Sequence, residues 1–243
     1  GHEKMLSSFL TMARNALKII NNPDIAMLTS RDEIDFHALR QRKTVIYLIA
    51  PETDAKHYSF LLNMFYTQFF DAVKQPQYIN QGLPIHVLAD EFGHSSIPDF
   101  ASISMTIRKF RVSLSIVLQN YQQLKKQYGD DAETIFSGGM RTKLVYAGLD
   151  LETSKMVQDM LGRVVTEKKG SGGKTRRENN LMNADQIRQM SEDQALCVSA
   201  NKEPILLETT PAYRDRFLKQ VTSIPPAALP QPLAGRTLRY VDL

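Results

Sequence analysis

The chain has 243 residues, 42% hydrophobic and 23% charged, which is typical of a soluble globular protein of one large or two small domains. Its net charge of +4 is compatible with a nucleic-acid or membrane partner but too small to indicate one. A single cysteine, Cys197, excludes an internal disulfide framework, and the five histidines lack metal-site spacing. No apolar run reaches the roughly 18 residues of a membrane span, and no signal peptide opens the chain.

The expected elements begin with a helix over residues 3–20, whose apolar residues recur at three- and four-residue steps and form one apolar face. Residues 44–50 form the strongest expected strand, because they are β-branched, aromatic and uninterrupted. Further helices are expected at 55–73, 99–110, 121–128, 132–136, 151–161 and 183–190, and further strands at 83–89, 112–118, 142–147, 195–200 and 205–209. The alternation predicts an α/β fold with a mostly parallel sheet and helices on both faces.

Two segments depart from this alternation. Residues 163–180 are rich in Lys, Arg, Gly and Asn, and predict an exposed hairpin or a mobile loop. After residue 217 the chain becomes proline-rich, and we expect an extended tail there.

Two adjacent carboxylates, Asp90 and Glu91, follow the apolar run 83–89 directly. The run predicts a buried strand, and open α/β sheets bind their ligands at the carboxyl ends of strands. This is the arrangement of a Walker B element, in which Asp90 holds Mg²⁺ through water and Glu91 orients the water that attacks a γ-phosphate. The alternative is structural: Asp90 caps the next helix and Glu91 is a solvated acid in its first turn.

Two further polar residues follow in order. Gln119 comes after the next expected strand, and Arg108 lies on the helix before that strand. In doubly wound nucleotide-hydrolysing sheets, we expect these positions to face one crevice, where a glutamine senses the γ-phosphate and an arginine stabilises transition-state charge. Alternatively, Gln119 bonds only to the turn backbone, and Arg108 belongs to the surface of a basic helix.

The tripeptide Gly173-Lys174-Thr175 imitates the end of a phosphate-binding loop. The loop motif requires a glycine five residues earlier, where this chain has Lys168, and a buried strand before it and a helix after it. We therefore interpret the segment as a solvated basic loop. It has candidate contacts to a DNA backbone at Lys168, Lys169, Lys174, Arg176 and Arg177.

The ordered set of motifs resembles the type IV secretion coupling proteins, the TraG/TraD-like conjugative transfer ATPases. The motifs are VLADEFG at 87–93, IRKFRV at 107–112, IVLQNYQQL at 116–124 and YG at 128–129. The similarity continues through 150–162, LMNADQIR at 181–188 and PI at 204–205, so it covers roughly residues 40–218.

This resemblance implies a RecA-like ATPase that uses ATP and Mg²⁺ and assembles as a hexamer at the inner membrane. Its implied partners are DNA with its relaxase, protein effectors and inner-membrane secretion components, and its implied location is the cytoplasmic face of that membrane. By matching position, Asp90 and Glu91 are the Walker B pair, Gln119 is the sensing glutamine, and Arg108 is a candidate finger that acts on a neighbouring subunit.

The resemblance also implies a division of the chain and a missing part. Residues 1–40 correspond to the end of an all-alpha insertion, 41–218 to the C-terminal portion of the ATPase domain, and 219–243 to the tail. The Walker A strand and loop and the membrane helices are not in this sequence, so we expect a C-terminal part of a longer protein that does not hydrolyse ATP alone. Two alternatives are a non-catalytic RecA-like adaptor that binds a secretion substrate or a partner ATPase, and a different RecA-like translocase.

Overall fold

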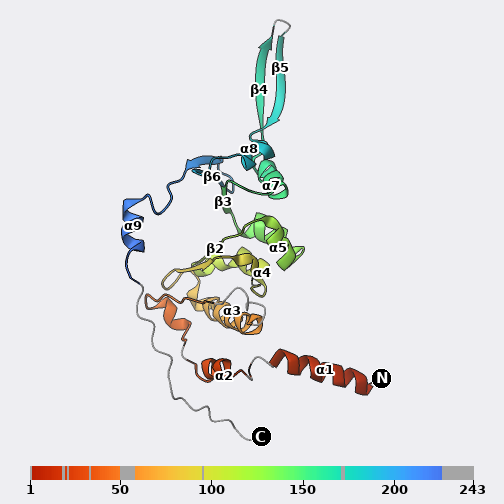
Figure 1. Ribbon diagram of the computed structural model, residues 1–243, viewed down its shortest axis with the longest axis vertical. Helices are drawn as coiled ribbons and strands as arrows, with labels where there is room; N and C mark the ends of the chain where they lie inside the picture. Colours follow the sequence, from red (N-terminus) through yellow and green to blue (C-terminus); the bar gives the residue numbers. More distant parts are fainter. Residues whose placement is uncertain are drawn as a thin grey trace.

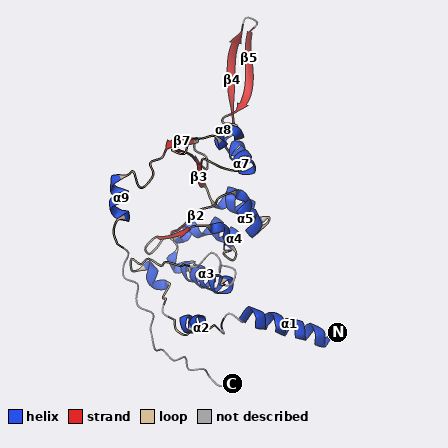
Figure 2. Ribbon diagram, viewed as in Figure 1, coloured by secondary structure: helices blue, strands red, loops and turns tan. Residues whose placement is uncertain are grey.

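The computed structural model describes residues 2–17, 20, 22–32, 34–49, 58–94, 96–170 and 173–225 (Figure 1). The helices are α1 (His2–Leu17), α2 (Pro23–Thr29), η2 (His37–Arg40), α3 (Ser59–Val73), η4 (Pro76–Tyr78), η5 (Phe92–His94), α4 (Phe100–Thr106), η6 (Ile107–Phe110), α5 (Tyr121–Tyr128), α6 (Asp131–Glu133), η7 (Thr134–Gly139), α7 (Leu151–Leu161), α8 (Ala184–Arg188) and α9 (Arg216–Thr222). The strands are β1 (Ile85–Ala89), β2 (Val112–Ile116), β3 (Thr142–Tyr146), β4 (Arg163–Gly170), β5 (Gly173–Asn180), β6 (Gln194–Ser199) and β7 (Ile205–Glu208) (Figure 2).

The strands form three separate groups among the described residues. β1 and β2 pair in parallel, with Ile85 opposite Val112 and Ala89 opposite Ile116. β3, β6 and β7 form an antiparallel sheet in the order β3-β6-β7, and β4 and β5 form an antiparallel hairpin. The predicted α/β class is confirmed, and the described parallel pairing lies in β1 and β2, which carry the predicted site.

Buried side chains gather in two clusters. The larger cluster joins α3, α4, α5 and η7 to β1 and β2, and its most buried members include Phe70, Val73, Phe92, Phe100, Leu124 and Ile135. The smaller cluster packs α7 and α8 against β3 and β6 around Val157, Ile187 and Leu196. A hydrogen bond joins a helix of the larger cluster to a helix of the smaller one, from the Tyr121 amide on α5 to Thr153 Oγ1 on α7 (3.2 Å).

The prediction of a strand at 44–50 is wrong for residues 44–49, and residue 50 lies outside the described residues. Val45, Tyr47 and Ile49 are 73%, 82% and 85% exposed, in a segment that pairs with none of the described strands. A high β-propensity expresses how well side chains pack on a sheet surface, so it does not form a strand when no neighbouring strand is present.

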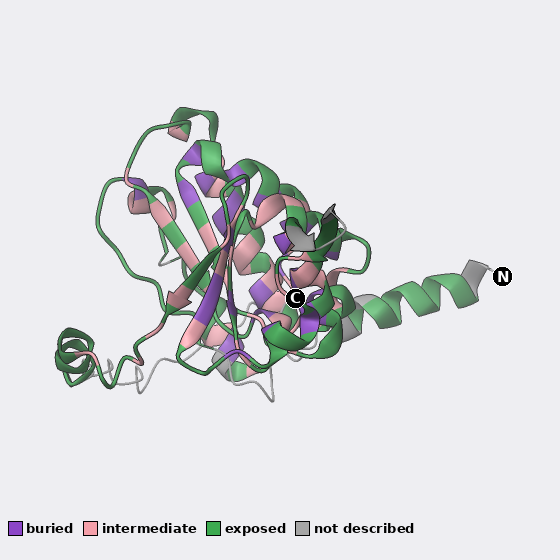
Figure 3. Cartoon of the chain, turned by 90° about the horizontal axis from the view of Figure 1, so that it is seen from above, coloured by how far each residue is buried: buried purple, intermediate pink, exposed green. Residues whose placement is uncertain are grey.

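The helix expected at 3–20 is confirmed as α1 over residues 3–17, and its apolar face is exposed. Met5, Phe9 and Met12 are all exposed, and α1 extends away from the rest of the chain (Figures 1 and 3). Helical periodicity therefore identified the secondary structure, whereas burial depends on a packing surface that the described residues do not provide.

Smaller differences have local causes. Residues 137–139 form the end of η7, a wide helical turn in which Gly139 lies directly against Ser104 of α4; a methyl group there would overlap the serine side chain. Helix α9 was not predicted. Its N-cap is Asp215, whose side chain accepts a hydrogen bond from the Leu218 amide (2.8 Å). The expected hairpin at 163–180 is confirmed, and residues 55–57 and 226–243 lie outside the described residues.

Candidate functional site

The carboxyl ends of β1 and β2 meet at one edge, as expected for parallel neighbours. Hydrogen bonds continue past the last ladder pair, from the Val117 amide to the Ala89 carbonyl (2.9 Å) and from the Phe92 amide to the Val117 carbonyl (3.0 Å). These bonds bring the turn after β1, which contains Glu91, beside the segment after β2, which contains Gln119.

Glu91 and Gln119 are in direct contact at this edge. The Gln119 Nε2 group donates to Glu91 Oε2 at 3.2 Å, with Oε1 at 3.5 Å, and both side chains are exposed. The structural alternative for Gln119, a bond only to the turn backbone, is therefore wrong. An exposed carboxylate held by an amide at strand ends is suited to orienting a water molecule against a phosphate.

The backbone of Glu91 adopts a left-handed conformation, with φ +50°. Side-chain-bearing residues rarely adopt this region, and they persist there only where the surroundings fix them. The neighbouring Phe92 supplies that restraint: it is 1% exposed, and its ring lies 4.7 Å from the Phe100 ring and 5.6 Å from the Tyr128 ring, centroid to centroid. The buried aromatic cluster therefore positions the exposed acid beside it.

A second glutamine, Gln123, fixes the turn that carries Gln119. Its Oε1 accepts a hydrogen bond from the Gln119 backbone amide (3.0 Å), and Asn120 caps α5 by accepting from the Gln123 amide (3.0 Å). A Cβ atom on Gly93 would lie 2.8 Å from the Gln123 side chain, so glycine permits this close approach. The roles of Phe92 and Gln123 are not apparent from the sequence pattern, apart from the i, i+3 spacing between the cap residue Asn120 and Gln123.

Helix α7 begins with a cap that also reaches α5. Asp150 accepts hydrogen bonds from the Glu152 and Thr153 amides (2.9 and 3.0 Å) and from Thr153 Oγ1 (2.6 Å), and the same hydroxyl oxygen accepts from the Tyr121 amide. Burial alone would raise the pKa of Asp150, but the hydrogen bonds from Thr153 and Glu152 outweigh it and lower the pKa. The segment after Gln119 is thus connected to α7 through a buried hydroxyl.

Asp90 is exposed at the end of β1, and its Oδ1 accepts a hydrogen bond from the Glu91 amide (3.1 Å). That contact is local to the turn and caps no long helix, because only the short η5 follows. The remaining carboxylate oxygen is a hard donor that fits a hydrated magnesium ion, which keeps several of its waters in nucleotide sites. Among the described residues, no group of three or more His, Cys, Asp and Glu side chains forms a direct metal cage.

Arg108 lies at the opposite end of the strand pair. It is exposed on η6, before β2 begins, and the nearby Arg111 carbonyl accepts a hydrogen bond from the Ile85 amide at the start of β1 (3.0 Å). A five-residue strand spans about 16 Å, which separates this end from the carboxyl end. The expectation that Arg108 shares one crevice with Glu91 and Gln119 is therefore wrong within a single chain.

The Gly173-Lys174-Thr175 tripeptide lies in β5, paired with β4, rather than at the start of a helix. A phosphate cradle requires amide groups that converge at a helix start, so the prediction that this tripeptide is no phosphate-binding loop is confirmed. All five candidate DNA-contact residues, Lys168, Lys169, Lys174, Arg176 and Arg177, belong to this hairpin, away from the strand-end site.

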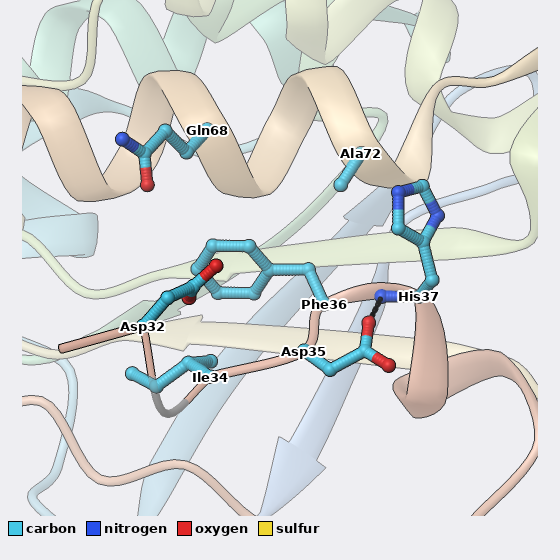
Figure 4. Close-up of a pocket in the computed structure, with 7 residues that line it drawn as sticks. All are labelled: Asp32, Ile34, Asp35, Phe36, His37, Gln68 and Ala72. Atoms are coloured by element: carbon cyan, nitrogen blue, oxygen red, sulfur yellow. Dashed lines mark hydrogen bonds between the residues drawn. The ribbon is translucent and has the colours of Figure 1, made fainter.

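A separate hollow of about 330 Å³ lies between the 32–37 segment and α3 (Figure 4). Its lining residues are Asp32, Ile34, Asp35, Phe36, His37, Gln68 and Ala72. Asp35 Oδ1 accepts the His37 amide (2.9 Å), so one carboxylate is used in the turn itself. The adjacent η2 is tied by Arg40 to the Leu83 carbonyl, before β1 (3.1 Å), and so it contacts the end of that strand away from Asp90.

A profile of the family described as "Type IV secretory system Conjugative DNA transfer" matches residues 1–233 of the chain. The chain belongs to this family. Curated relatives include Protein VirD4 of Rhizobium rhizogenes, 19% identical, and Protein VirD4 of Rhizobium radiobacter, 21% identical, each matched over 94% of this chain. Those matches cover 36% and 35% of the VirD4 proteins, so the chain spans about a third of their length.

Solved structures of the bacterial conjugative coupling protein TrwB have the same fold. The unbound form of TrwBdeltaN70 gives a TM-score of 0.70 at 16% identity, over 84% of this chain and 49% of that one. TrwB in complex with ADP and Mg²⁺ also gives 0.70 at 16% identity, over 85% of this chain and 50% of TrwB. The likeness confirms the predicted RecA-like fold class, and the chain spans half of the fold that TrwB displays.

Within the described residues, no helix combines the length and the apolar character needed to cross a bilayer.

Proposed function

We propose that this chain is the C-terminal portion of an ATPase motor that couples conjugative DNA transfer to type IV secretion. The observation that carries the proposal is the contact of Gln119 with Glu91 at the carboxyl ends of two parallel strands. Family membership supports the process, and the complex of the structural neighbour TrwB with ADP and Mg²⁺ supports the ligand.

The residues divide the chemistry in the following way. Asp90 holds magnesium through water, and Glu91 orients the attacking water. Gln119 senses the γ-phosphate, and its hydrogen bond to the Glu91 carboxylate connects the sensing residue to the water-orienting one. The magnesium ion, when bound with nucleotide, neutralises the charge that develops on the phosphates. The tripeptide in β5 does not cradle the phosphates, because it lies in a paired strand and not at the start of a helix.

We assign Arg108 to a neighbouring subunit's site. It is exposed and lies at the other end of the strands from its own Glu91, so it reaches a reacting phosphate only across an interface between copies. This assignment requires a ring, and the proposed assembly is a hexamer at the cytoplasmic face of the inner membrane. The proposed partners are DNA with its relaxase, protein effectors and inner-membrane secretion components.

The proposed division of the chain follows the same logic. Residues 1–40 are the end of an all-alpha insertion, 41–218 the ATPase portion and 219–243 a proline-rich tail. Within the ATPase portion, the proposed DNA-binding element is the β4–β5 hairpin, because it holds all the candidate cations: Lys168, Lys169, Lys174, Arg176 and Arg177.

The deciding experiment measures ATP turnover of the full-length protein with Glu91→Gln. Loss of the water-orienting carboxylate should reduce turnover by about 100-fold or more while nucleotide binding persists. The matched control is Glu152→Gln, another exposed acid near the start of a helix, which should retain full activity. Turnover near the wild-type rate in Glu91→Gln would overturn the assignment of Glu91. A full-length wild-type protein that neither binds nor hydrolyses ATP would favour the adaptor.

A mixing experiment tests Arg108. Arg108→Ala and Glu91→Gln subunits should each be inactive alone, but a mixture contains interfaces with an intact Arg108 facing an intact Glu91. Turnover should therefore recover in mixtures of full-length subunits. A mixture as inactive as either parent contradicts action between subunits.

A further inference from the structure

The β4–β5 hairpin, here called the ribbon (residues 163–180), leaves the chain between α7 and α8 and projects beyond them (Figure 1). None of its described side chains belongs to either apolar cluster, and Val165 is 59% exposed although it is apolar. Residues 163–166 and 176–179 of the ribbon are exposed, so their side chains are accessible to a partner.

The strand register assigns each paired residue of β4 and β5 to one of two faces, because successive positions alternate between the faces of a strand and directly paired positions share a face. One face, the mixed face, carries the pairs Arg163–Asn180, Val165–Glu178, Glu167–Arg176 and Lys169–Lys174. The other, the acid-free face, carries the pairs Val164–Asn179, Thr166–Arg177, Lys168–Thr175 and Gly170–Gly173.

The charges on the two faces differ in kind. Both acids of the ribbon lie on the mixed face, where Arg163 is 3.7 Å from Glu178 and Arg176 is directly opposite Glu167 in register. The register assigns Lys168 and Arg177 to the acid-free face, where Thr166 is paired with Arg177 and Asn179 lies two residues further along β5. Asn179 Nδ2 donates to Thr166 Oγ1 at 2.9 Å, so these polar groups form one continuous surface.

This composition matches one class of nucleic acid better than another. A two-stranded ribbon fits the major groove of duplex DNA, and cations with hydroxyl and amide groups are the usual donors to its phosphates. Single strands are instead held by bases stacked on aromatic rings, and residues 163–180 contain no aromatic residue. Because the acid-free face carries neither acidic nor aromatic residues, it is better suited to binding the phosphate backbone of duplex DNA than to binding single strands.

We propose that the acid-free face of the ribbon binds the phosphate backbone of duplex DNA independently of base sequence, through Lys168 and Arg177. The proposal deepens the proposed function, on which it rests for the presence of DNA, by naming the face and the form of the nucleic acid. Arg176 and Lys169 lie on the opposite face and contribute only at long range.

The test compares two neighbouring arginines of β5 that differ in face. Arg177→Ala and Arg176→Ala each remove one exposed positive charge, so long-range electrostatics change equally. Binding of the full-length protein to a fluorescent 25-base-pair duplex, without nucleotide, is measured by anisotropy over a series of salt concentrations. Arg177→Ala should weaken binding several-fold and reduce the slope of log affinity against log salt by about 0.9, the value for one phosphate contact. Arg176→Ala should change the affinity less than two-fold.

Equal losses in the two variants, a larger loss in Arg176→Ala, or no loss in either would overturn the assignment of the face. Tighter binding to a 25-nucleotide single strand than to the duplex would overturn the assignment of duplex DNA. Unchanged thermal midpoints of both variants show that neither result reflects unfolding. Because this measurement involves no ATP turnover, its failure is separate from the failure of the proposed motor, which the Glu91→Gln turnover assay tests.

Discussion

The strand-end site and the ribbon are both exposed, but they are held in place by different forces. Glu91 adjoins Phe92, a fully buried ring, and the amide of Gln119 is bonded to Gln123. The described ribbon side chains join neither core cluster, so its shape depends on the ladder between β4 and β5. Substitutions that destabilise the core should therefore also disrupt the strand-end site. Substitutions in the ribbon should leave the global stability of the protein nearly unchanged.

The strongest test of this contrast is Phe92→Ala. Removal of a buried ring that packs on Phe100 and Tyr128 should lower the free energy of unfolding by about 3–5 kcal/mol. Urea unfolding followed by far-UV circular dichroism measures it. Leu88→Ala, in the adjoining strand but 73% exposed, is the control and should cost less than about 1 kcal/mol. Similar losses in the two variants would show that the buried ring does not anchor the site.

Gly139→Ala tests the packing of η7 on α4. The added methyl group would overlap Ser104, so we expect a loss of about 1–3 kcal/mol in the free energy of unfolding. The double variant with Ser104→Gly removes the obstructing atoms and should lose less than the sum of the two single variants. Strict additivity in urea unfolding would contradict the proposed overlap.

Asp150→Ala tests the link between the site and α7, which adjoins the ribbon. Loss of the cap should cost about 1 kcal/mol near neutral pH. Because hydrogen bonds lower the pKa of Asp150 in the folded state, the stabilisation is complete above the unfolded value of about 4 and is lost as the pH falls through the lower, folded pKa.

The pH dependence of that cap provides its own control. The difference in unfolding free energy between wild type and Asp150→Ala should narrow as the pH is lowered below about 4. Asp150→Asn keeps a capping oxygen without the charge, so the difference between Asp150→Asn and Asp150→Ala should not depend on pH. A difference that is constant with pH would mean that the charge of Asp150 does not stabilise α7.

The smallest effect is expected in the ribbon. Arg163→Ala removes the ion pair with Glu178, whose side chains are 65% and 59% exposed, so the free energy of unfolding should fall by about 0–1 kcal/mol and by less at high salt. Amide hydrogen exchange should be faster in β4 and β5 than in β1 and β2. Equal protection of the two regions would remove the contrast between them.

The sequence predicted those parts of the site that depend on local pattern. An apolar run followed by two acids placed Asp90 and Glu91 at a strand end, and the next strand placed Gln119 on the same edge, as the structure has it. Neighbouring parallel strands end at the same edge of a sheet. Predicting the two strands and their order was therefore enough to place these residues on one edge.

The wrong predictions concern features that depend on the path of the chain or on packing partners from other elements. Arg108 lies on a helix that returns to the start of the next strand, so its place in the sequence between the two site residues does not bring it near them. Residues 44–49 have the composition of a strand but no partner strand among the described residues. Phe92 and Gln123 escaped because their roles are contacts between elements, which periodicity does not encode.

The short connection between α7 and the ribbon has a mechanical consequence. Gly162 follows α7 with φ +74°, and its carbonyl accepts the Leu181 amide (3.0 Å), which closes the base of the ribbon. Each paired strand has eight residues, about 26 Å of lever arm, so a tilt of about 10° at this pivot displaces the far end by about 5 Å. A small tilt of α7 that leaves both core clusters intact would therefore displace the far end of the ribbon by more than the 3.4 Å rise of one base pair.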